Sequence, residues 1–205
     1  MSRNYTVIRA VSATRGAKNL DFKTGDFISV KDMVSIMDML ELIRTRRSIR
    51  RYKKEAVPED LVAKILEAGS WAPSASNSQP WWFIILKDHK VREAVAQATT
   101  YGKFLADAPL GIAVIIDPHA STHAVEDGAL ATQNMLLASH ALGLGTCWIG
   151  AYGSGYEENV KELLRVPKAM RVLSIISIGY PAESPRGTRK ELEGITFTDF
   201  YGRKR

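Results

Sequence analysis

Hydrophobic and polar residues alternate along most of this chain with the spacings of helices and strands. Apolar residues recur every three or four positions in several stretches, which is typical of amphipathic helices. This spacing predicts helices over residues 33–46, 58–69, 90–98, 122–142 and 157–164. The fourth stretch is rich in Ala, Leu and Met and carries few charges, so we expect a buried helix there.

Short apolar runs between these stretches are typical of buried strands. They cover residues 81–86, 110–116, 145–149 and 172–178. Residues 194–200 alternate between apolar and polar, which indicates an edge strand. The order of helices and strands alone suggests an α/β domain with a parallel sheet, although periodicity does not determine strand direction.

The N-terminal region differs from the rest because residues 1–30 show no strong period. We therefore expect residues 1–36 to be an N-terminal extension and residues 37–205 to form one domain. An appended arm, a short strand around Tyr5–Val11 and an upstream extension of the natural start all remain open for this region.

Composition excludes several protein classes. With 45% hydrophobic and 24% charged residues, the chain reads as globular and not as disordered. A single cysteine, Cys147, excludes an intrachain disulfide framework and a multi-cysteine metal site. No apolar run approaches the roughly 20 residues that span a bilayer, and residues 1–16, which are basic and lack an apolar core, do not read as a secretory signal. We expect a cytoplasmic protein without a membrane partner.

Positive charge is concentrated in two places, which suits phosphate binding. Residues 44–54 hold seven Arg or Lys residues and no acidic residue, and the second group is Arg186, Arg189 and Lys190. Within the first group, Arg46-Arg47-Ser48-Ile49-Arg50 offers guanidinium groups and a hydroxyl where a helix gives way to a loop. The alternative is that these arginines neutralise the negative end of the preceding helix dipole.

Two further segments carry candidate binding residues. The loop from Pro73 to Pro80 holds short polar side chains between prolines, which suits hydrogen bonding to a cofactor or, alternatively, an ordinary turn. Glycines flank the short strand near Cys147, from Gly143 to Gly150, and allow close approach of a planar ligand. They do not form a dinucleotide-binding fingerprint, because no third glycine follows at the required spacing.

Taken together and in this order, these segments resemble the FMN-dependent nitroreductase family. The resemblance rests on RRSIR (46–50), PSASNSQPW (73–81), GLGTCWIG (143–150) and RKELE (189–193), and it covers roughly residues 38–202. It implies an α+β fold with a central, mostly antiparallel sheet flanked by helices, which replaces the parallel interpretation. It also implies an intertwined homodimer with shared active sites, in which each C-terminal arm adds a strand to the partner's sheet.

The resemblance further implies which residues bind FMN. Residues expected to contact the FMN of their own chain are Arg46, Arg47, Ser48 and Arg50. Those expected to contact the FMN of the other chain are Pro73, Ser74, Ala75 and Asn77. Residues expected beside the ring are Trp148, Ile149 and Gly150, and those expected at the phosphate are Arg189 and, less directly, Lys190 or Arg186. Ala75 and Gly150 lack the hydroxyl and carboxylate that some relatives carry there.

The implied activity is hydride transfer from NAD(P)H through flavin N5 to a small oxidised acceptor, such as a nitroaromatic or a quinone, by a ping-pong mechanism. We expect no catalytic side chain and no metal. The four histidines read as structural or solvated, and Cys147 reads as a small packed residue. Tyr101, Lys103 and Phe104 are candidates for the acceptor side, although helix-end packing explains them equally well.

Two alternatives remain open at this stage. Within the family, the same flavin scaffold supports dehalogenation, flavin fragmentation and enone reduction, and fold alone does not separate these. From a different class, residues 44–54 suit a nucleic-acid-binding protein. Against the latter, Trp71, Trp81 and Trp82 lie in no recognisable nucleic-acid-binding module, so we expect no nucleic-acid partner.

Overall fold

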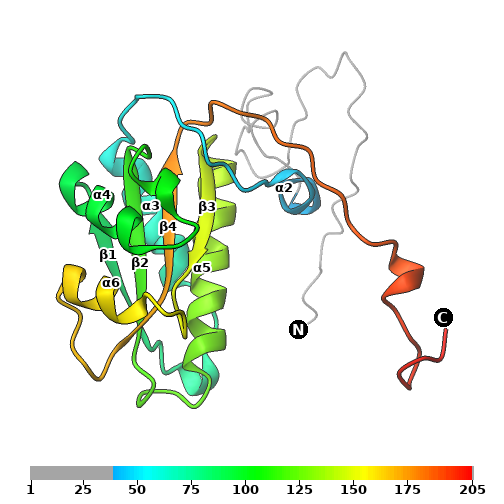
Figure 1. The fold of residues 1–205 in the computed structure, drawn as a ribbon. Coiled ribbons are helices and arrows are strands. Elements are labelled where there is room, and N and C mark those ends of the chain that lie inside the picture. The colour runs from blue at the N-terminus through cyan, green and yellow to red at the C-terminus, as the bar shows by residue number, and fades with distance from the viewer. Residues whose placement is uncertain (1–38, 205) are drawn as a thin grey trace, which may run out of the picture. The chain divides into compact units, whose positions relative to one another are not determined.

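The computed structural model of the chain describes residues 39–204 (Figure 1). Of the helix expected over residues 33–46, it describes α2 (Met39–Thr45). The expected strand around Tyr5–Val11 and the expected domain boundary after residue 36 lie outside the described residues. The compact unit that carries the sheet begins at Leu42.

The described residues form a four-stranded sheet in the order β1-β2-β4-β3. Its strands are β1 (Trp81–Leu86), β2 (Leu110–Ile116), β3 (Gly145–Gly150) and β4 (Arg171–Gly179). Every neighbouring pair is antiparallel. The expected α+β fold is therefore confirmed, and the parallel arrangement suggested by periodicity alone is wrong. The apolar runs located the strands but carried no information on their direction.

Helices cover both faces of this sheet (Figure 1). On one face, α3 (Glu59–Ser70) and α5 (Ala124–Ala141) pack around a core that includes Ile65, Met135 and Ile176. On the other face, α4 (His89–Ala98) and α6 (Glu157–Leu164) pack around a core that includes Val95, Val160 and Ile175. Since both faces are covered, β2 is buried along its whole length and β4 is buried except at its first residue.

The ends of these helices follow from local chemistry. Helix α3 follows Pro58 and carries Glu59 and Asp60 in its first turn, where negative charge is favoured. Asp88 caps α4, because its side chain accepts hydrogen bonds from the backbone N–H groups of Lys90 and Val91. None of the helices among the described residues is both long and apolar enough to cross a membrane.

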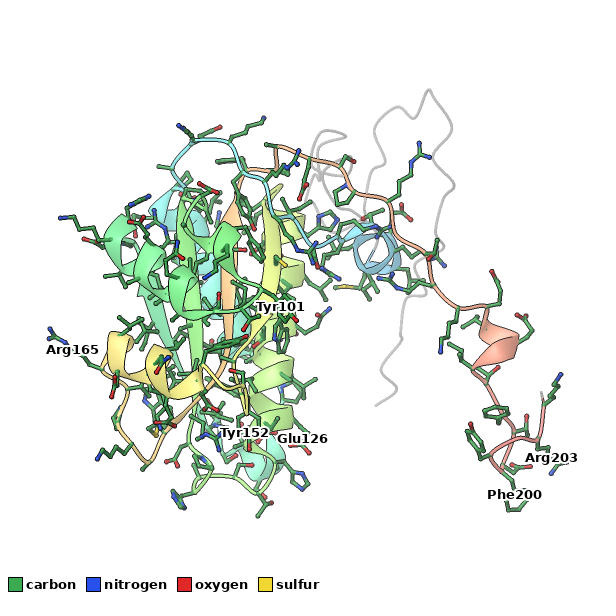
Figure 2. All side chains as sticks on the ribbon, in the orientation of Figure 1. Tyr101, Glu126, Tyr152, Arg165, Phe200 and Arg203 are labelled. Atoms are coloured by element: carbon green, nitrogen blue, oxygen red, sulfur yellow. The ribbon has the colours of Figure 1, made fainter. Side chains whose placement is uncertain are left out.

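The C-terminal tail differs from expectation. Residues 194–200 form no strand in the single chain, where the short turn Leu192–Gly194 is followed by irregular backbone and one isolated bridge between Phe197 and Lys204. The apolar residues of this segment are largely exposed, and Phe200 is 71% exposed (Figure 2). An alternating pattern forms a strand only where it pairs with a sheet edge, and in the described chain this tail pairs with no strand of the sheet.

Candidate active site beside strand β3

The segment from Arg46 to Arg50 runs beside β3 after α2 ends at Thr45. Ser48 forms a parallel bridge with Thr146, and the Ile49 N–H donates to the Thr146 carbonyl at 2.8 Å. A Cβ atom at Gly145 would lie 2.7 Å from the Ile49 side chain. The space beside Gly145 is therefore filled by the Ile49 side chain and not by a ligand. The glycines are expected to allow close approach of a ligand, but at this position the chain itself makes that approach.

Two residues that sequence reasoning missed hold this segment in place. The Tyr52 hydroxyl donates to the Ile49 carbonyl and lies 2.6 Å from the Ser177 hydroxyl on β4. Burial raises the pKa of Tyr52 although its bond with Ser177 opposes the shift, so the phenol stays protonated. One carboxylate oxygen of Glu183 accepts the N–H groups of Arg50 at 2.6 Å and Arg51 at 3.2 Å.

Three arginines of the expected site, Arg46, Arg47 and Arg189, gather here and form what we call the arginine cluster. Burial lowers the pKa of Arg46, and the positive charges of Arg189 and Arg47 lower it further. A Cβ atom at Gly187 would lie 3.1 Å from Arg47 Nε and 3.7 Å from Arg189 Nη1. No ion pair joins the cluster to a carboxylate of the described residues. Such an arrangement is unfavourable until an anion binds.

The other explanation for these arginines, capping of the preceding helix, holds for Arg47. Its guanidinium donates to the carbonyls of Arg44 at 2.6 Å and Arg46 at 2.8 Å, near the C-terminal end of α2. Arg186 and Lys190 are exposed on the tail.

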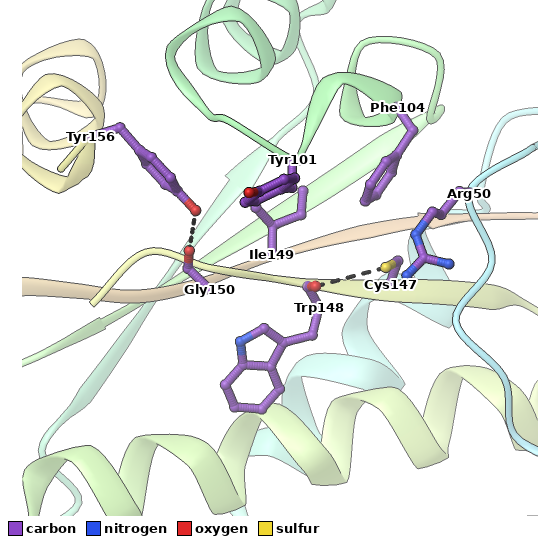
Figure 3. Close-up of a pocket in the computed structure, with 8 residues that line it drawn as sticks. All are labelled: Arg50, Tyr101, Phe104, Cys147, Trp148, Ile149, Gly150 and Tyr156. Carbon is purple, nitrogen blue, oxygen red and sulfur yellow. Dashed lines mark hydrogen bonds between the residues drawn. The ribbon is translucent and has the colours of Figure 1, made fainter. Parts of the chain in front are cut away.

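A cavity of about 450 Å³ lies over β3 next to the segment 46–50 (Figure 3). It is lined by Arg50, Tyr101, Phe104, Cys147, Trp148, Ile149, Gly150 and Tyr156. Tyr101 and Phe104, expected on the acceptor side, both contribute to its wall. Lys103 does not, because its ammonium group donates to the carbonyl of Gln97.

The strand alternation determines which groups face this cavity. Ile149 points toward Tyr101, whereas the Trp148 side chain points to the opposite face, toward α5 (Figure 3). Trp148 therefore presents only its backbone to the cavity, and its indole packs against the α3–α5 core. Tyr156, which the sequence did not suggest, donates a hydrogen bond to the Gly150 carbonyl.

Cys147 lies between the arginine cluster and the cavity, and it is buried. Burial raises the pKa of its thiol, while the nearby Arg50 charge and a hydrogen bond with Ser48 oppose that shift. A protonated, buried thiol is a poor nucleophile. These observations agree with the interpretation of Cys147 as a small packed residue.

The loop from Pro73 to Pro80 lies at the other end of the sheet. It leads into Trp81 at the start of β1, which pairs with Ile116 at the end of β2. Ile116 in turn pairs with Arg171 at the start of β4. The arginine segment instead adjoins Thr146, which pairs with Ile178 near the end of β4. Strands β1 and β3 are also the two outer strands of the described sheet. One chain therefore does not bring the two expected halves of the site together.

Comparison with known proteins agrees with this architecture. The model of the nitroreductase family matches residues 43–102 and 92–180. This chain belongs to the nitroreductase family.

Two relatives illustrate the range of names within the family. A protein of Methanothermobacter thermautotrophicus, provisionally named NADH dehydrogenase/NAD(P)H nitroreductase, is 41% identical over 79% of this chain and 86% of its own length. An iodotyrosine deiodinase of Thermotoga neapolitana is 29% identical over 76% of this chain and 96% of its own length.

Solved structures of similar proteins show the same fold. An FMN-dependent nitroreductase of Clostridium difficile superposes with a TM-score of 0.75 at 33% identity and covers 80% of this chain and all of its own. A provisionally named nitroreductase of Desulfovibrio desulfuricans, solved in complex with FMN, superposes with a TM-score of 0.71 at 35% identity. It covers 79% of this chain and 96% of its own.

Proposed function

We propose that this protein binds FMN and uses NAD(P)H to reduce a small oxidised acceptor, such as a nitroaromatic or a quinone. The names of its relatives support the class of activity, and FMN appears in the names of two solved neighbours. The observation that carries the proposal is the arginine cluster, which lacks a carboxylate partner among the described residues and lies beside a cavity of about 450 Å³.

The residues at this place fit FMN. Its phosphate needs charged donors, and Arg46, Arg47 and Arg189 supply guanidinium groups for charge-assisted hydrogen bonds. Lys190 follows Arg189 directly and would add a positive charge. Arg50 lines the cavity and Ser48 bonds the Cys147 thiol, so both would lie near the polar chain and the carbonyl edge of a flavin.

The remaining groups would position and shield the ring. When bound, FMN would supply the redox chemistry, accepting hydride from NAD(P)H and passing it to the acceptor. Ile149 and the backbone of Trp148 and Gly150 form the floor of the cavity. Tyr101, Phe104 and Tyr156 form aromatic walls that would exclude water from a planar substrate.

We further propose a homodimer in which two chains share each site. Pro73, Ser74, Ala75 and Asn77 lie at the opposite end and the opposite edge of the sheet from the arginine segment. A two-fold axis can bring the loop of one chain to the arginine segment of its partner. The exposed tail segment 194–201 would then pair with an edge of the partner's sheet.

The first test is the visible spectrum of the purified protein together with an FMN titration. Wild-type protein should show flavin bands and release FMN, not FAD, on denaturation. Arg46→Ala should weaken FMN binding at least about tenfold, because one charge-assisted hydrogen bond contributes about 1.5–3 kcal/mol. Lys64→Ala removes one exposed positive charge from α3 and should leave FMN affinity unchanged.

The same experiment separates this proposal from a nucleic-acid-binding function. A colourless protein that fails to bind added FMN but binds RNA or DNA through residues 44–54 would overturn the proposal. Release of FAD, or an unchanged FMN affinity in Arg46→Ala, would contradict the assignment of the phosphate site.

A further inference from the structure

The loop expected to reach the partner's flavin is held in an unusual backbone conformation. Ser76, Asn77 and Gln79 have φ angles of 52°, 55° and 47°, in the left-handed region that non-glycine residues rarely adopt. Three such residues within four positions store strain, and strain of this kind persists only where surrounding contacts fix it. Some group outside the turn must therefore hold it.

Among the described residues, the side chain that bonds this loop from outside is the carboxylate of Asp127, in the first turns of α5. Asp127 is only 3% exposed. Its Oδ1 accepts the backbone N–H of Ala75 at 3.0 Å, and its Oδ2 accepts the hydroxyl of Ser121 at 2.7 Å. The Ser121 oxygen accepts the His123 N–H at 3.0 Å, so the loop before α5 is also fixed. Each carboxylate oxygen accepts from a different loop. Asp127 on α5 therefore connects the loop 73–80 to the loop that precedes α5.

The bond to Asp127 determines which groups of the loop remain free. The Ala75 N–H points inward to Asp127, and the Ala75 carbonyl accepts the Ser78 N–H. The Ser74 hydroxyl oxygen accepts the Gln79 N–H at 3.0 Å. Asn77 is exposed, and its amide nitrogen donates to none of the described residues, while its Oδ1 accepts from Gln79 Nε2 at 3.1 Å. Ala75 is thus an anchor, and Asn77 is the group presented outward.

We propose that Asp127 is a positioning residue for the flavin site of the partner subunit, acting through Ala75 on the orientation of Asn77. This inference rests on the proposed function, since it requires FMN and a shared site. Asp127 touches neither the arginine cluster nor the cavity over β3 of its own chain. Its effect on FMN should therefore appear in the site completed by the partner's arginines.

The test compares two substitutions with a control. Asp127→Ala removes both acceptors, so the strained turn should relax and must be rebuilt on binding. Rebuilding a single left-handed residue should weaken FMN binding at least about fivefold. Asp127→Asn keeps an oxygen for Ala75 N–H and gains an amide that donates to Ser121, so its dissociation constant should stay within about threefold of wild type. Ser139→Ala removes a buried hydroxyl of α5 that bonds its own helix and should resemble wild type.

A mixed dimer separates positioning from general destabilisation. With Asp127→Ala on one chain and Arg46→Ala on the other, one site carries both lesions and its twin carries none. About half of the sites should then bind FMN with wild-type affinity. The arginines of the twin site belong to the Asp127→Ala chain. If Asp127 merely stabilised its own chain, the twin site would therefore be impaired as well.

Three outcomes would overturn this inference. They are unchanged FMN affinity in Asp127→Ala, equal losses in Asp127→Ala and Asp127→Asn, and a mixed dimer without a wild-type site. If wild-type protein fails to bind FMN at all, the proposed function falls, and this inference falls with it. If wild-type protein binds FMN and Asp127→Ala binds it equally well, only the role of Asp127 is rejected.

Discussion

His140, in the last turn of α5, lies close enough to the arginine cluster to be affected by its positive charge. Its Nε2 lies 2.9 Å from the Thr45 hydroxyl, one residue before Arg46. Burial lowers the pKa of His140, and the positive charges of Arg46 and Arg47 lower it further. The unfolded chain therefore binds a proton at this histidine more readily than the folded chain does.

The sign of the resulting pH effect follows from this difference. Because the folded pKa lies below the unfolded value of about 6.5, stability is complete above that pH and falls as the pH drops toward the folded pKa. Urea unfolding of the protein without FMN should show a loss of stability below about pH 6.5. His140→Asn should lose part of this pH dependence, and His89→Asn, on α4, should retain it. Identical pH profiles for wild type and His140→Asn would contradict this assignment.

Among single residues, the sequence could identify the phosphate-binding candidates but not the residues that hold them. Arg46, Arg47 and Arg189 belong to short motifs whose chemistry is visible without a structure. Tyr52 and Asp127 act on backbone or hydroxyl groups that are 125 and 52 residues away. No local pattern marks a side chain whose partner lies so far away in the sequence.

At the scale of elements, the loop between β3 and α6 depends on the buried carboxylate of Glu157. Its two oxygens accept from Arg171 Nε at 2.7 Å and Nη2 at 2.6 Å, and also from the N–H groups of Gly153 and Val172. Burial alone would raise the pKa of Glu157, but the bonds from Arg171 and the two backbone groups outweigh it and lower the pKa. The Arg171 guanidinium also stacks 4.4 Å from the Tyr152 ring centre.

Arg171→Met should therefore destabilise the protein substantially. The substitution leaves a buried carboxylate without its cation, which costs about 3 kcal/mol in comparable pairs. Urea unfolding at pH 7 should show a loss of that size, whereas Lys64→Met, which breaks an exposed pair on α3, should cost less than about 1 kcal/mol. A loss in Arg171→Met as small as that of the control would show that the ion pair contributes little.

The elements themselves were largely predictable, and the reason differs from one to the next. The run 110–116 matches β2 at both ends because turn-forming residues, among them Asp117-Pro118, bound an uninterrupted apolar stretch. The buried helix expected over residues 122–142 is observed as α5, shorter by two residues at the start and one at the end. The strand expected at 194–200 is absent because no edge of the same chain pairs with it.

At the scale of the whole molecule, the proposed shared site makes a prediction that a monomer would not satisfy. A mixed dimer carrying Arg46→Ala on one chain and Asn77→Ala on the other should recover about half of the wild-type FMN occupancy and activity. Each parent homodimer should be strongly impaired. If the arginine segment and the loop served the same site within one chain, every site would carry one lesion, and no recovery would appear.

Steady-state kinetics of the intact protein test whether NAD(P)H and the acceptor use the same face of the flavin. Plots of initial rate against NAD(P)H at several acceptor concentrations should give parallel lines in double-reciprocal form. NAD(P)H alone should also bleach the flavin absorbance without an acceptor. Intersecting lines together with no bleaching would reject the two-step mechanism.

The order of the strands also has a consequence for how the chain is made. Strand β4 lies between β2 and β3 in the sheet, yet it is the last of the four along the sequence. Until residues 171–179 have left the ribosome, β3 has no strand beside it, and β2 exposes one edge. The first half of the chain can form the β1–β2 pair and little more of the sheet. Completion of the sheet, and with it the floor of the cavity, must wait until β4 has been synthesised.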